Sequence, residues 1–144
     1  LTDCITRYRL EVLPGKAPHT QVDHGRYLEM IEAVHGRMHP RHLRAVHIRQ
    51  FVDQLGAKPT RANRCLEVYK HLLGMAVQWG AIDQNPAREV TRFRLAPRRR
   101  YVSDADFRAV YAAAEPMVQC AMDLAVLTGL RRADLLGLTR ASLT

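Results

Sequence analysis

The clearest pattern in the chain is a helical one, and it is strongest between residues 60 and 80. Apolar residues recur there at the spacing that places them on one side of a helix: Ala62, Cys65, Leu66, Tyr69, Leu72, Leu73, Ala76 and Val77. The other side carries Asn63, Arg64, Glu67, Lys70, His71 and Gln78. This pattern predicts a helix with a wide buried face and a mainly basic, hydrogen-bonding face opposite.

The same spacing predicts three earlier helices, at about residues 2–13, 20–34 and 44–55. The apolar side of the second is expected to hold Tyr27, Leu28, Met30, Ile31 and Val34. Pro14, Pro18 and Pro59 are expected to lie in the connections. No segment alternates apolar and polar residues with a two-residue period, so an all-α fold is predicted.

Three further helices are expected after Asn85-Pro86. Ser103 and Asp106 form a variant of the capping box, with Asp in place of the usual Glu. Pro116 suits a first helical turn, and the segment from there to Leu127 is apolar around most of its circumference. That segment is expected to be a core helix with neighbours on nearly every side. Thr128-Gly129 should end it, and a last helix should start near Leu130–Arg131.

Charge is distributed unevenly along the chain, and this distribution indicates what kind of partner the protein binds. Residues 1–50 hold 8 basic and 5 acidic residues, residues 51–100 hold 10 and 4, and residues 101–144 hold 4 and 5. An arginine-rich run, with Glu89 as its only acid, contains Arg88, Arg92, Arg94, Arg98, Arg99 and Arg100. Such a run is typical of an extended basic linker whose charges a polyanion neutralises. We therefore expect a helical bundle at 1–94, a linker at 95–101 and a second unit at 102–144.

Double-stranded DNA is the expected polyanion. A helix fits the major groove, and Arg, Lys, Asn and Gln side chains contact phosphates and base edges. The predicted DNA-binding residues are Arg61, Asn63, Arg64, Lys70, His71, Arg94, Arg98, Arg99 and Arg100. The alternative for the helical residues alone is an ordinary solvated face.

Other classes of site have little support in the sequence. The longest apolar stretch is far too short to span a bilayer. Cys4, Cys65 and Cys120 are scattered, which indicates free thiols in a reducing, cytoplasmic compartment. His35 and His39 have a metal-ligand spacing, but Gly36 and Pro40 interrupt the helix this would need, so no metal site is expected.

The segment Leu127-Thr128-Gly129-Leu130-Arg131-Arg132-Ala133-Asp134-Leu135 resembles a signature of the tyrosine-type site-specific recombinases, or phage integrases. Their catalytic domain carries Thr-Gly-x-Arg-x-x-Glu-Leu, and Asp134 stands where the family usually has Glu. Upstream, residues 79–86 look like the end of the family's core-binding domain. Residues 61–64 are similar to the start of the helix that lies on DNA, and residues 101–104 to the entry of the catalytic domain.

The resemblance implies a SAM-like core-binding bundle followed by the first helices of a catalytic domain. It makes Arg131 a catalytic arginine that neutralises the scissile phosphate, and Asp134 the acidic residue that supports it. The family cuts DNA through a phosphotyrosyl intermediate, with no metal or nucleotide cofactor, as a tetramer assembled on DNA. We expect an active parent protein at the bacterial nucleoid.

The family's lysine, His-x-x-Arg motif and nucleophilic tyrosine follow the arginine by a long stretch. All five tyrosines of this chain precede Arg131, so the chain alone is expected to be inactive. Two alternatives remain open. One is a helical DNA-binding regulator in which Arg131 is only structural. The other is an interaction module or membrane-surface protein, although the apolar side of residues 60–80 has the breadth of a bundle core.

Overall fold

The computed structural model describes residues 1–97, 100–139 and 141, and every regular element in these residues is helical. The predicted all-α class is therefore confirmed. The internal contacts divide the chain into two units, Leu1–Ala96 and Pro97–Thr144, which are described separately below. Within the described residues, no helix has the length and apolar character needed to cross a membrane.

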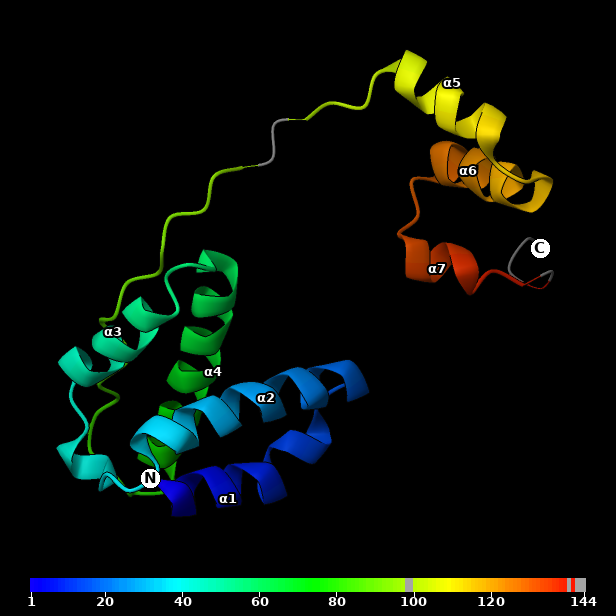
Figure 1. Cartoon of the computed structure of the whole chain (residues 1–144). Helices are drawn as coiled ribbons and strands as arrows, with labels where there is room; N and C mark the ends of the chain where they lie inside the picture. The colour runs from blue at the N-terminus through cyan, green and yellow to red at the C-terminus, as the bar shows by residue number, and fades with distance from the viewer. Residues whose placement is uncertain (98–99, 140, 142–144) are drawn as a thin grey trace. The chain divides into compact units, whose positions relative to one another are not determined.

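Unit 1 contains four α-helices and two short 3₁₀ turns (Figure 1). The elements are α1 (Thr2–Glu11), η1 (Leu13–Gly15), α2 (Pro18–His35), η2 (Pro40–His42), α3 (Ala45–Gln54) and α4 (Pro59–Gln78). Both α2 and α4 start at a proline, whereas the sequence pattern placed Pro18 and Pro59 in the connections. Proline is tolerated there because the first N–H groups of a helix have no carbonyl partner within it.

Helix α4 forms the centre of unit 1 and packs against α1, α2 and α3. Its predicted apolar stripe is buried except for Val77, which is half-buried. The facing side chains are Ile5 and Tyr8 of α1, Leu28 and Ile31 of α2, and Ile48, Phe51 and Val52 of α3. The period of the sequence thus predicted most of the core of this helix correctly, but it missed Val68, which is 4% exposed.

In α2, the pattern was wrong at its last turn. Val34 is 53% exposed, and His35 takes the inner position instead with 6% exposure. At about 100° per residue, position 35 falls between Leu28 and Ile31 on the helix circumference, whereas position 34 does not. Tyr69 makes this polar side chain tolerable in the core, because its hydroxyl lies 2.9 Å from Nδ1 of His35.

The chain after α4 packs back onto the bundle. Gly80 makes the turn with a φ of 73°, a conformation that favours glycine. Ile82, Ala87 and Val90 are then buried, and Asn85 donates from Nδ2 to the carbonyl of Lys70 at 2.8 Å. The packed part of unit 1 therefore continues to Phe93, which lies against the core, and the first part of the arginine-rich run belongs to the folded bundle and not to a linker.

Unit 2 contains α5 (Asp104–Ala113), α6 (Pro116–Thr128) and α7 (Arg132–Leu136). Its local signals were predicted correctly: Ser103 and Asp106 make both bonds of the capping box, and Gly129 ends α6 with a φ of 64°. The expectation of a core helix was wrong. No described residue of unit 2 is buried, and Leu127 of α6 is 82% exposed.

Candidate nucleic-acid interface

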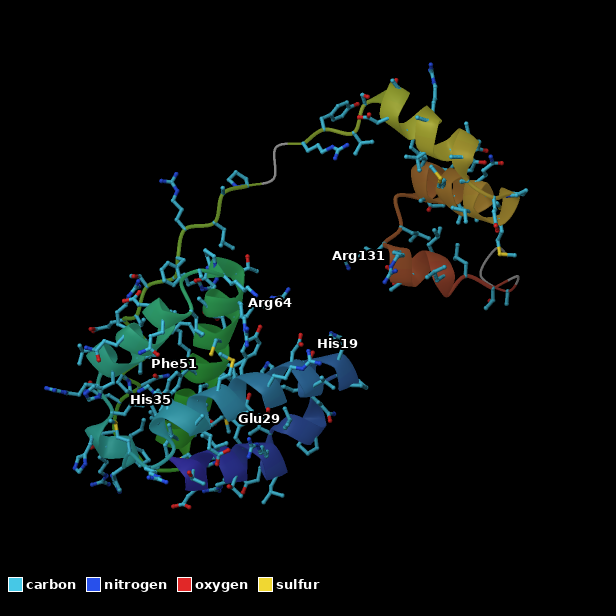
Figure 2. The ribbon with its side chains drawn as sticks, viewed as in Figure 1. His19, Glu29, His35, Phe51, Arg64 and Arg131 are labelled. Carbon is cyan, nitrogen blue, oxygen red and sulfur yellow. The ribbon has the colours of Figure 1, made fainter. Side chains whose placement is uncertain are left out.

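Arg61 and Arg64 occupy the first two turns of α4, and both side chains are exposed. Figure 2 labels Arg64 on this helix. Arg61 donates from its guanidinium to Sδ of Met30 at 3.3 Å. Among the described residues, neither arginine has an acidic partner. The start of a helix also carries the positive end of its dipole, so this end of α4 favours an anion.

Asn63 lies in the same turn and was predicted to contact DNA, but its side chain holds the backbone of the returning chain instead. Its Nδ2 donates to the carbonyl of Phe93 at 2.8 Å, and the N–H of Phe93 donates to its Oδ1 at 2.8 Å. The side chain is only 9% exposed. The sequence predicted Asn63 on the free polar side of α4, and this was wrong, because the returning chain covers the side chain and its amide is bonded to Phe93.

Neighbouring contacts hold the same returning segment. Arg92 forms a 2.8 Å ion pair with Glu67 of α4. Arg49 donates to the carbonyl of Thr91 at 3.2 Å, and its guanidinium carbon lies 5.0 Å from the centre of the Phe93 ring. All three of Arg92, Arg94 and Arg100 are exposed, but only Arg92 has an acidic partner among the described residues. Arg98 and Arg99 lie outside the described residues.

Five of the nine acidic side chains of unit 1 form ion pairs within the unit. The pairs are Arg7–Glu11, Arg9–Glu32, Arg26–Asp23, Arg49–Asp53 and Arg92–Glu67. Unit 1 has 15 basic and 9 acidic residues, so ten cations and four acids remain outside these pairs. Exposed pairs of this kind add little stability. Because each pair contains one cation and one acid, the surplus of six positive charges remains on the groups outside the pairs.

Lys70 and His71, also predicted to bind DNA, line a small cavity together with Lys16, His24, Glu67 and Val68. His71 is anchored through Nδ1, which lies 2.9 Å from the buried hydroxyl of Tyr8. Burial, and secondarily Lys16, lowers the pKa of His71 below its ordinary value of 6.5. The contribution of Tyr8 was not predicted, because it depends on packing between α1 and α4.

Arg131 lies at the junction of α6 and α7. Thr128 donates from Oγ1 to the carbonyl of Leu124 at 2.6 Å, and Gly129 then redirects the chain. Arg131 follows in an extended conformation as the N-cap residue of α7. The side chains of Arg131 and Asp134 are both exposed, and no ion pair joins these two described residues.

Other site types find no geometric support in the part of the chain that the structure describes. There, no group of three or more His, Cys, Asp or Glu side chains is placed to hold a metal ion.

No protein-family model, curated protein or solved structure matches the chain. The resemblance to recombinases therefore rests on the motifs quoted above.

Proposed function

We propose that unit 1 binds duplex DNA and that the chain is the front part of a tyrosine-type site-specific recombinase. The observation that carries the DNA-binding part is the surplus of unpaired cations on unit 1. Unit 1 contains fifteen basic and nine acidic residues, and five of those acids form ion pairs within the unit. A surface of this kind gains free energy when it replaces the counterions around DNA.

Helix α4 is the proposed contact element. Its first turns present Arg61 and Arg64 to solvent, and Lys70 and His71 lie two turns further along. Arg94 and Arg100 are exposed on either side of Arg98 and Arg99, and these four arginines are the proposed second contact. Asn63 and Arg92 are left out, because their polar groups are used within unit 1.

The catalytic part of the proposal rests on the sequence resemblance. Arg131 would bind the scissile phosphate with its planar guanidinium, and Asp134 would support it in the complete protein. The exposed apolar side chains of α6 would be covered by the remainder of a catalytic domain, and the complete protein would assemble as a tetramer on DNA. The SAM-like description of unit 1 and a location at the nucleoid belong to the same proposal.

Fluorescence anisotropy with duplex DNA over a series of salt concentrations tests the binding. Each phosphate contact adds about −0.9 to the slope of log K against log salt concentration. The double variant Arg61→Ala/Arg64→Ala should therefore flatten that slope by up to about 1.8. The control is Arg7→Ala/Arg26→Ala, which removes the same charge from two ion-paired arginines. Equal slopes for the two double variants would exclude the start of α4 from the interface.

A nicked suicide substrate, which traps the phosphotyrosyl adduct, tests the catalytic part in the complete protein. Arg131→Ala should lower the rate of adduct formation on the order of a hundredfold while DNA affinity is retained. Arg132→Ala is the neighbouring control. Equal damage from both variants would contradict the role of Arg131. A complete protein that binds DNA and never forms an adduct would instead be a helical DNA-binding regulator.

A further inference from the structure

A cavity of about 490 Å³ lies over the contact of α1, α2 and α4. Its lining residues are Lys16, His24, Glu67, Val68, Lys70 and His71, and we call it the Tyr8–histidine pocket. Behind it, the wholly buried Tyr8 places its hydroxyl 3.1 Å from Nδ1 of His24 and 2.9 Å from Nδ1 of His71. One hydroxyl thus positions two imidazole rings from two different helices.

The proton count at this hydroxyl assigns different roles to the two histidines. A tyrosine hydroxyl has one proton, so it can donate to only one imidazole nitrogen, and the other imidazole must donate to the tyrosine oxygen. Burial raises the pKa of Tyr8 to about 12, so the hydroxyl keeps its proton. The accepting histidine then carries its proton on Nε2. The donating histidine has a free Nε2 that can take up a proton without breaking the bond to Tyr8.

The charges around the pocket are mainly positive. Lys16 and Lys70 line it, and its one acid, Glu67, is paired with Arg92. Asp23, next to His24 on α2, lies 3.9 Å from Arg26. Burial first, and then Lys16, lowers the pKa of both histidines, while Asp23 partly opposes this at His24. The lining of the pocket therefore lacks negative charge that could balance its lysines, and at neutral pH both His24 and His71 are in the neutral form.

A second tyrosine–histidine pair in the same unit provides an internal comparison. Tyr69 and His35 form a single hydrogen bond of 2.9 Å, with His35 only 6% exposed. That pair shows that one imidazole suffices for a buried tyrosine hydroxyl. At Tyr8 there are two imidazoles, and both line an open cavity beside two lysines. The need of a buried tyrosine hydroxyl for a hydrogen-bond partner therefore does not account for the two histidines at Tyr8.

We propose that the Tyr8–histidine pocket binds a phosphate group and takes up one proton when it does so. Lys16, Lys70 and the Nε2–H groups of His24 and His71 together offer donors to several phosphate oxygens. The cavity has room for the atoms attached to the phosphate as well as for the phosphate itself. The assignment of that phosphate to a DNA backbone rests on the proposed function, since Lys70 and His71 lie on α4; a free phosphate is the other source.

Nitrogen-15 NMR of the histidine side chains in the full chain measures the binding directly. Sulfate is the probe, because it has the shape of phosphate and keeps its charge near neutral pH, and chloride at equal ionic strength is the reference. Saturable shifts are expected at His24 and His71 and none at His35. Linked uptake of one proton should weaken the apparent affinity by up to about tenfold per pH unit above the histidine pKa.

Matched variants separate a binding role from a structural one. Lys16→Gln/Lys70→Gln should lower sulfate affinity at least about tenfold, whereas Lys58→Gln, outside the pocket, should not. His71→Asn retains a polar nitrogen near Tyr8 but lacks Nε2, so it should lower both the affinity and its pH dependence at an unchanged fold. Absent shifts at His24 and His71, or equal affinities in the two lysine variants, would overturn the proposal.

Duplex DNA provides the second arm of the experiment. If DNA produces the same histidine shifts and displaces sulfate, the phosphate belongs to DNA. If sulfate binds but DNA moves neither histidine, the DNA assignment is overturned and the pocket is a site for free phosphate. If anisotropy shows that DNA binds but the signals of the two histidines do not change, the proposed function is retained. The DNA then binds elsewhere on unit 1.

Discussion

The two units are built from helices with similar local signals, but only one of them has a core. Among the residues that the structure describes, all 21 buried hydrophobic ones lie in unit 1. In unit 2, α6 is apolar around most of its circumference, but Met117 is 85% exposed and Leu127 is 82% exposed. Apolar content by itself therefore does not decide which side chains are buried.

The difference comes from the number of surfaces available to each helix. Helix α4 has α1, α2 and α3 packed against it, and the returning chain covers a further strip. Helix α6 has the short α7 and a few bonds to α5, such as Tyr111 Oη to Asp123 Oδ2 at 2.9 Å. Hydrophobic stabilisation scales with the apolar area removed from water, so unit 1 gains most of it. Exposed apolar patches such as that of α6 are typical of contact surfaces.

Substitution of one leucine in each unit should give the largest contrast. Leu72→Ala removes a wholly buried side chain of α4 and should destabilise unit 1 by about 2–5 kcal/mol. Leu127→Ala removes an exposed side chain and should change stability by no more than about 0.5 kcal/mol. Urea unfolding followed by circular dichroism measures both. Comparable losses would mean that α6 is packed in solution, against a partner surface or a second copy.

The returning segment should show a smaller effect. Asn63→Leu leaves the N–H and carbonyl of Phe93 without their partners, which should cost on the order of 1 kcal/mol. It should also speed trypsin cleavage after Arg92 relative to cleavage after the exposed Arg94. Gln78→Leu, an exposed change on the same helix, is the control. An unchanged cleavage ratio would show that Asn63 does not hold this segment.

Acid should produce the smallest effect, and only in unit 1, which contains all seven histidines. Burial lowers the pKa of His24, His35 and His71 in the folded state below the ordinary 6.5. As the pH falls below that value, the unfolded chain binds protons first, so stability is complete above it and decreases below it.

Thermal denaturation at three pH values between about 7.5 and 5.5 measures this decrease. His35→Gln should reduce the difference in melting temperature between the ends of the range, whereas the exposed His19→Gln should not. A melting temperature that rises on acidification would contradict the sign of the effect.

Some features of this protein follow from interactions within a few residues, and these were predictable from the sequence. The apolar stripe of α4, the capping box of Ser103 and Asp106, the start at Pro116 and the stop at Gly129 depend on helix period and local hydrogen bonds. The charge surplus is also a property of the sequence. It indicates a polyanion partner and the candidate residues Arg61 and Arg64, both of which are exposed.

Other features depend on residues far apart in the chain, and only tertiary structure decided them. Asn63 was withdrawn from the candidate interface by Phe93, 30 residues later, and Tyr8 is joined to His71 across 63 residues. Packing also placed His35 inside and left α6 exposed. The physical reason is that a periodic pattern states which side of a helix is polar or apolar, but which neighbour covers that side depends on how the helices are arranged.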